Sequence, residues 1–108
     1  MNESFCVVMT TTGSLGEAHD LAEMLVERKL AACVQLINIT SIYRWNGELS
    51  KEPEMLLLIK TTMDRYHAVE AAIQEKHTYE VPEIVQIPIE QGLNTYLDWV
   101  RNSTTDVS

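Results

Sequence analysis

The chain has 108 residues, with 16 acidic and 8 basic side chains and a formal net charge of -8. This length fits one domain, predicted at residues 1–108 with an ordered part from about 5 to 101 and a polar tail at 102–108. The negative charge repels a phosphate backbone or an acidic bilayer, so neither nucleic acid nor a membrane is an expected partner.

The ends and the cysteines of the chain bear on its compartment. Residues 1–4 have no basic leader region, and no apolar run approaches the ~18 residues of a membrane span, so we expect a cytoplasmic protein. Cys6 and Cys33 both lie in apolar surroundings, which is typical of small buried side chains in a reducing compartment.

The first part of the chain predicts a strand followed by a helix. Residues 5–9 are apolar without polar alternation, which is typical of a strand buried on both faces. Ser14 and Glu17 have the spacing of a capping box at a helix start. Arg28 and Lys29 are predicted in the last turn, where cations complement the helix dipole. Between them, apolar residues recur at helical spacing: Ala18, Leu21, Ala22 and Leu25.

The middle of the chain predicts a long β-hairpin. Residues 33–45 form one strand, and Asn46-Gly47 is a strong signal for a type I′ turn. A second strand runs from about residue 48 to 60. Its apolar part, 55–59, predicts a central strand covered on both faces. Pro53 places the outer half of this strand at an edge or at a bulge.

The last part of the chain predicts two helices separated by a strand. Thr62 caps a helix that ends near His77, residues 83–89 form the strand, and Asn94 caps a short helix. The resulting order, β-α-β-β-α-β followed by α, is that of an α+β, ferredoxin-like fold. In this fold an antiparallel sheet carries both long helices on one face.

The predicted hairpin is too long for its domain. Its 13-residue first strand spans on the order of 40 Å at ~3.3 Å per residue, whereas a domain of this size has a radius of gyration of about 13 Å. The hairpin therefore projects, or folds back at a bulge near Asn38 or Pro53. We expect projection and coverage by other copies in a head-to-tail ring, because exposed apolar strands aggregate. The predicted interface residues are Ile39, Tyr43, Trp45 and Leu49.

Four segments of the sequence resemble the CutA divalent-cation tolerance family. They are 29–34 (KLAACV), 41–47 (SIYRWNG), 60–62 (KTT) and 77–84 (HTYEVPEI). The match keeps its order from about residue 5 to 101. The resemblance implies a ferredoxin-like subunit in a tight homotrimer with interlocking hairpins. It also implies a non-catalytic, cytosolic protein of metal-ion tolerance.

The sequence offers few ligands for a metal ion. His67 and His77 are ten residues apart, about 15 Å along a helix, so they cannot bind one ion within a subunit. His19 is predicted to be a surface residue. Some CutA-like proteins carry a Cys at the end of the first strand and paired His after the second helix. This chain has Thr10 and Lys76-His77 at those positions. We expect no required cofactor and only weak binding of a divalent cation, copper or zinc, with His77 as the candidate ligand.

A cleft between subunits is the other predicted site. Thr10 to Gly13 precede a capped helix and offer hydroxyls and amides to a small anion, without the spacing of a nucleotide motif. Lys60 is predicted to pair with Glu83 or to face the cleft. Glu80 is predicted to be a hydrated carboxylate in a loop. The predicted cleft residues are Thr10, Thr11, Lys60, Tyr79 and Glu83.

Three functions remain open from the sequence. The leading hypothesis is a trimeric protein of divalent metal-ion tolerance or homeostasis that binds metal weakly or indirectly. The alternative is a trimeric small-molecule sensor similar to the PII-like regulators, with an effector in the clefts between subunits. An acylphosphatase-like enzyme on the same fold is disfavoured, because the first loop lacks the Arg that such chemistry needs.

Overall fold

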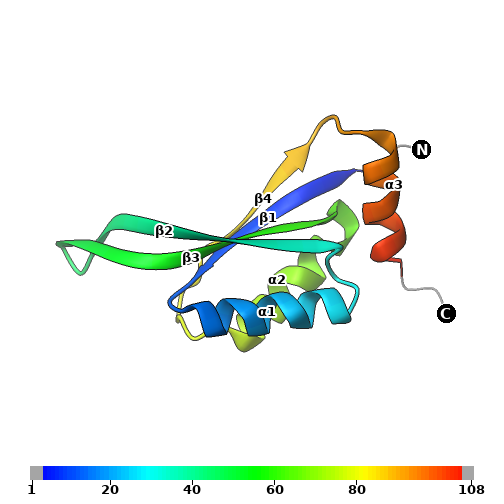
Figure 1. The fold of residues 1–108 in the computed structure, drawn as a ribbon. Helices are drawn as coiled ribbons and strands as arrows, with labels where there is room; N and C mark the ends of the chain where they lie inside the picture. Colours follow the sequence, from blue (N-terminus) through cyan, green and yellow to red (C-terminus); the bar gives the residue numbers. More distant parts are fainter. Residues whose placement is uncertain (1–3, 106–108) are drawn as a thin grey trace.

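The computed structural model describes residues 4–105 as an antiparallel sheet with helices (Figure 1). A single 3-10 turn, Met63–Arg65, precedes α2. The elements in chain order are β1 (Phe5–Thr12), α1 (Leu15–Glu27), β2 (Cys33–Trp45), β3 (Glu48–Thr62), α2 (Tyr66–Lys76), β4 (Ile84–Ile89) and α3 (Asn94–Ser103). This order confirms the predicted ferredoxin-like α+β class.

The sheet has the strand order β2-β3-β1-β4, with every neighbouring pair antiparallel. Figure 1 shows α1 and α2 together on one face of this sheet, and α3 at the end of the sheet away from the hairpin turn. The main core lies between the sheet and the two long helices, and a small second cluster under α3 contains Phe5, Ala32 and Val100. The largest fully buried apolar side chains of the main core are Val8, Leu21, Leu25, Leu57, Ile59, Val69 and Ile73.

Burial alternates in the middle of the two central strands, at residues 6–9 and 55–59, which corrects the prediction that both faces are covered there. Cys6 and Val8 on β1, and Leu57 and Ile59 on β3, are buried on the side of the helices. The residues between them belong to the opposite face, which we call the open face, and are only partly buried: Val7, Met9, Leu56 and Leu58. An apolar run therefore marks a central strand here without showing that the chain covers both of its faces itself.

The hairpin of β2 and β3 is continuous. The two strands pair without interruption from Cys33 opposite Lys60 to Trp45 opposite Glu48, so the hairpin contains no bulge and does not fold back. The part of β3 before residue 55 pairs with β2 alone, as expected for an edge that contains Pro53. The hairpin projects from the body of the protein (Figure 1). Together with the hairpin, the chain measures 47 × 27 × 21 Å.

The hairpin turn agrees with the sequence prediction, whereas the end of helix α1 differs from it. Asn46 and Gly47 have φ of 52° and 78°, as the predicted type I′ turn requires. Helix α1 ends at Glu27, before the two basic residues that were expected in its last turn. Arg28 and Lys29 therefore follow the helix, and Lys29 reverses the chain with a φ of 60°.

The remaining helix ends also differ from the prediction. The Thr62 hydroxyl bonds to the Asp64 carboxylate and caps no backbone amide, and α3 is preceded by Leu93 as its N-cap, so Asn94 is its first residue. Helix α3 runs to Ser103, and Thr104 is buried with its hydroxyl donating to the Val100 carbonyl at 3.0 Å. Residues 106–108 of the predicted tail lie outside the described residues.

Both cysteines are free thiols, and they differ in burial. Cys6 is buried in the core, and Cys33 is only partly buried. Burial, with a smaller contribution from Asp64, raises the pKa of the Cys6 thiol to about 11. In the part of the chain that the structure describes, no helix is long and apolar enough to cross a membrane.

Candidate functional site: a groove beside the hairpin

A groove of about 590 Å³ opens where β1 ends beside the projecting hairpin. Beyond Thr12, the outer part of β3 pairs with β2 alone among residues 4–105, and the connection 77–83 between α2 and β4 forms the opposite wall. Three aromatic side chains and three carboxylates line the groove: Tyr43, Trp45, Tyr79, Glu54, Glu80 and Glu83. The other lining residues are Thr11, Ser41, Ile42 and Val81, so no Lys, Arg or His is found among the described residues around it.

The structure brings three of the five predicted cleft residues together in this groove: Thr11, Tyr79 and Glu83. Thr10 points to the opposite side, beneath the helices, because side chains alternate along a strand. It is fully buried, and its hydroxyl has no hydrogen-bond partner among the described residues.

Lys60 lies away from the groove and does not pair with Glu83. It sits opposite Val7, four residues from Thr11 along β1, and its Nζ donates to the Gln35 side-chain oxygen at 2.9 Å. The sequence predicts that Lys60 ends a central strand, but β3 continues to Thr62, and the register between β1 and β3 places Lys60 beside Val7.

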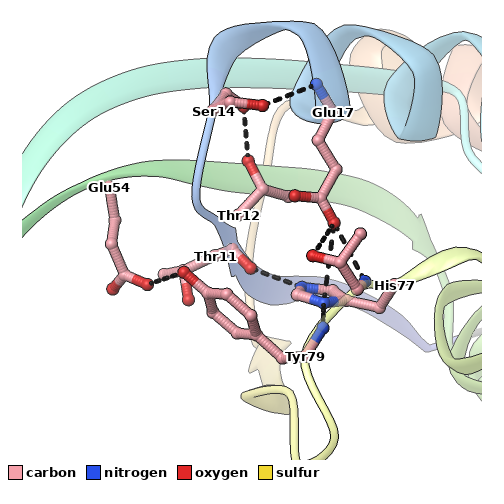
Figure 2. A network of polar contacts seen from close by, with 8 residues as sticks. Thr11, Thr12, Ser14, Glu17, Glu54, His77 and Tyr79 are labelled. Atoms are coloured by element: carbon pink, nitrogen blue, oxygen red, sulfur yellow. Dashed lines mark hydrogen bonds and ion pairs between the residues drawn. The ribbon is translucent and has the colours of Figure 1, made fainter.

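His77 uses both of its ring nitrogens within the chain (Figure 2). Its side chain is fully buried. Nε2 lies 2.6 Å from the Thr11 carbonyl oxygen, which can only accept, so Nε2 carries the proton. Nδ1 accepts the Tyr79 N–H at 3.0 Å. The ring is therefore a neutral imidazole that ties the start of the connection 77–83 to β1, and a metal ion could reach it only by displacing one of these bonds.

Glu17 holds the same connection to the start of α1. Its backbone N–H donates to the Ser14 hydroxyl at 3.2 Å, as one half of the predicted capping box requires. Its carboxylate accepts two bonds from Thr78, from the N–H at 3.1 Å and from the hydroxyl at 3.0 Å, and lies 3.7 Å from His77 Nδ1. The helix start and the connection are thus fixed to each other by one carboxylate (Figure 2).

Tyr79 reaches across the groove to the hairpin. Its ring packs on His77, with centroids 4.7 Å apart, and its hydroxyl donates to Glu54 Oε2 at 2.7 Å. Burial and the hydrogen bond to Glu54 raise the pKa of Tyr79, so the phenol stays protonated and remains a donor. A Cβ at position 13 would lie 3.2 Å from the Tyr79 hydroxyl, so Gly13 leaves room for this ring.

Glu54, Glu17 and Thr78 are members of this network that the sequence did not assign to a site. The available signal for Glu54 was the alternation of β3, which places it on the same face as Leu56 and Thr11. For Glu17 the capping-box pattern was visible, but its bonds to Thr78 depend on a contact between residues 61 positions apart.

The arrangement suits binding more than catalysis. The groove carboxylates come from both of its walls, and across residues 4–105 no group of three or more His, Cys, Asp or Glu is placed to hold a metal ion. Aromatic faces next to uncompensated carboxylates favour a cationic or amphipathic partner.

The residues predicted at a subunit interface are accessible in the single chain. Tyr43, Trp45 and Leu49 expose 41%, 57% and 73% of their surfaces, and Ile39 is partly buried. Tyr43 and Trp45 also form part of the groove wall.

Known proteins resemble this chain over nearly its whole length. The divalent-cation tolerance protein CutA of Thermus thermophilus is 46% identical over 99 residues, which is 91% of this chain and 96% of that protein. The CutA homolog of Xenopus laevis is 51% identical over 84 residues, 77% of this chain. The chain spans only 56% of the Xenopus protein.

Solved structures agree with the sequence matches. The Thermus thermophilus protein superposes with a TM-score of 0.90 at 44% identity, covering 94% of this chain and 99% of its own. A CutA from Archaeoglobus fulgidus, described as periplasmic, gives 0.91 at 35% identity, covering 96% and 100%. A sequence model of the family "CutA1 divalent ion tolerance protein" matches residues 6–103. The chain therefore belongs to the CutA1 divalent ion tolerance protein family.

Proposed function

We propose that this chain forms a homotrimer that acts in divalent metal-ion tolerance, without catalysis and with weak or indirect metal binding. The observation that carries the proposal is membership of the CutA1 divalent ion tolerance protein family. A tolerance role agrees with the Thermus thermophilus relative, a divalent-cation tolerance protein.

The uncovered surfaces support self-association. On the open face of the sheet, Ile37, Val85 and Ile87 expose 42%, 45% and 47% of their surfaces, and the hairpin adds Trp45 and Leu49. Apolar strands with free edges are aggregation sites unless another chain covers them. Three copies in a closed ring would cover the hairpins, and Ile39, Tyr43, Trp45 and Leu49 remain our proposed contact residues.

Two features favour weak or indirect metal binding over a dedicated centre. His77, the proposed ligand, has both nitrogens engaged, and the carboxylates of residues 4–105 do not gather into a three-ligand group. The net charge of -8 still concentrates cations around the protein, copper and zinc among them. We retain the cytoplasm as the proposed compartment, which fractionation of cells would test.

A second candidate function follows from the groove. A cavity of about 590 Å³ is within the size range of small-molecule sites, and it contains Thr11, Tyr79 and Glu83 of the predicted cleft. This supports the alternative of a trimeric sensor that binds an effector at the boundary between subunits.

The trimer is tested by light scattering on a size-exclusion column. We expect a mass three times that of the 12.3 kDa chain, and a stable monomer would overturn the trimer. Calorimetric titration with Cu²⁺, Zn²⁺ and Mn²⁺ tests direct metal binding, and an absence of saturable heat would leave only an indirect role. Thermal-shift screening with nucleotides and organic acids tests the sensor, because a specific ligand raises the melting temperature.

A further inference from the structure

The negative charge of the groove is not balanced within one chain. Glu80 and Glu83 are exposed and make no hydrogen bond or ion pair with another described residue, and Glu54 receives only the Tyr79 hydroxyl. No cationic side chain is among the described lining residues. Whatever fills the groove therefore meets carboxylates without a counter-charge.

The projecting hairpin carries the opposite charge on one of its faces. Arg44 pairs with Leu49 and Ile42 with Lys51, so Arg44 and Lys51 are diagonal neighbours on the same face. Both are exposed, and neither has a partner among the described residues. We call these two residues the basic hairpin face.

The opposite face of the hairpin, which carries Tyr43 and Trp45, lines the groove of the same chain. Tyr43 and Trp45 alternate with Arg44 along β2, and both line the groove. One face of the hairpin thus forms a groove wall. Ile42, on the same face as Arg44 and Lys51, also lines the groove, whereas Arg44 and Lys51 do not. A second copy is a suitable occupant, because an Arg side chain stacks on aromatic rings while it pairs with carboxylates.

We propose that the basic hairpin face of one copy docks into the groove of a neighbouring copy, where Arg44 and Lys51 pair with Glu80 and Glu83. This inference rests on the proposed trimer and specifies its contact. The two surfaces differ from each other, so the contact is head-to-tail and must close as a ring to leave no surface free. It also gives copies with a charge of -8 each a locally attractive contact.

Charge reversal in both partners tests the pairing. Arg44→Glu and Glu83→Lys are each expected to raise the concentration at which the trimer dissociates by about tenfold or more. The double variant R44E/E83K is expected to return to within about threefold of the wild type, because the reversed charges again attract. Sedimentation velocity over a dilution series measures all of these values.

Matched controls separate the pairing from net charge and from folding. Lys29→Glu and Glu75→Lys make the same charge changes at exposed positions outside the hairpin and the groove. At about 150 mM salt, where the long-range repulsion between copies is screened, they should leave dissociation unchanged. Far-ultraviolet circular dichroism checks that each variant is folded.

The outcomes distinguish this inference from the proposed function. If the wild type is trimeric but the dissociation concentration of the double variant does not return toward that of the wild type, the docking alone is overturned. The docking alone is also overturned if the single variants dissociate at the same concentration as the wild type. In that second case the groove stays open to a small cationic ligand. A monomeric wild type would overturn the trimer and this contact with it.

Discussion

At the scale of single residues, His77 shows how a candidate metal ligand can have a structural role. Its position after the second helix suggested a ligand, yet Nε2 donates to the Thr11 carbonyl and Nδ1 accepts the Tyr79 N–H. A histidine that bonds through both nitrogens holds its neighbours in place and keeps a single tautomer. The connection 77–83 is positioned by this ring together with Glu17.

The substitution His77→Ala should destabilise the protein by about 2 kcal/mol, because it leaves the buried Thr11 carbonyl without its donor and the Tyr79 N–H without its acceptor. Urea unfolding at a fixed protein concentration measures the change. His67→Ala is the matched control: His67 is exposed on α2, so its loss should change stability by no more than about 0.5 kcal/mol. Equal losses in both variants would contradict this role of His77.

The hydrogen bond from Tyr79 to Glu54 should make stability depend on alkaline pH. The pKa of Tyr79 is raised in the folded protein, so the folded state holds the phenol proton more tightly than the unfolded chain, where the pKa is about 10. The contribution is therefore fully present below about pH 10 and is lost as the pH rises above it.

Comparison of the wild type with Tyr79→Phe isolates this contribution. At neutral pH we expect the variant to be less stable by about 1 kcal/mol, the usual net value of one hydrogen bond. Melting temperatures measured from about pH 7 to about pH 11 should show this difference shrinking above pH 10. A difference that stays constant over the whole range would show that the phenol proton plays no part.

At the scale of elements, the hairpin was the part most completely predicted. Its turn followed from Asn46-Gly47, and its length followed from an uninterrupted run of strand residues. The coverage of its neighbours was not predictable, because an apolar run such as 55–59 looks the same whether helices or other subunits cover it. Here α1 and α2 cover one face only (Figure 1).

The groove could be predicted only in part, for a similar reason. Thr11, Tyr79 and Glu83 come together because β4 begins beside the end of β1, with Ile84 opposite Thr10. The sequence predicts Lys60 in the same cleft, because Lys60 follows the apolar run of a central strand. The β1–β3 register instead places Lys60 opposite Val7. Motifs along the chain name the residue types, whereas register decides which of them meet.

Truncation of the hairpin aromatics tests their part in assembly. Tyr43→Ala and Trp45→Ala should each raise the dissociation concentration of the proposed trimer about tenfold or more, because large aromatic side chains dominate contact energies. Leu15→Ala is a suitable control, since Leu15 exposes 54% of its surface at the start of α1 and does not line the groove. Dilution in the ultracentrifuge measures the effect, and dissociation like that of the control would show that other residues anchor the contact.

At the scale of the whole molecule, charge opposes the assembly that the apolar surfaces favour. Three copies carry three times -8, a formal charge of -24, in one particle. Repulsion of this kind acts over long distances, whereas apolar burial and close ion pairs act only at contact. Assembly at neutral pH therefore requires the contact terms to exceed the long-range repulsion.

This balance predicts how salt acts on the proposed trimer. At about 10 mM salt the Debye length is about 30 Å, comparable with the size of the chain, and at about 150 mM it is about 8 Å. Added salt should thus screen the repulsion between copies first, while ion pairs in a desolvated contact are screened less. We expect the dissociation concentration to fall between these two salt concentrations.

Neutralising acids far from the contact should imitate the effect of salt. Glu23 and Glu27 are exposed on α1 and do not line the groove. Replacing both with Gln lowers the electrostatic repulsion between copies and leaves the hairpin unchanged. At low salt the double variant should dissociate at a lower concentration than the wild type, and at about 150 mM the two should converge. A wild type that dissociates more readily as salt is added would mean that exposed ion pairs, and not apolar burial, hold the copies together.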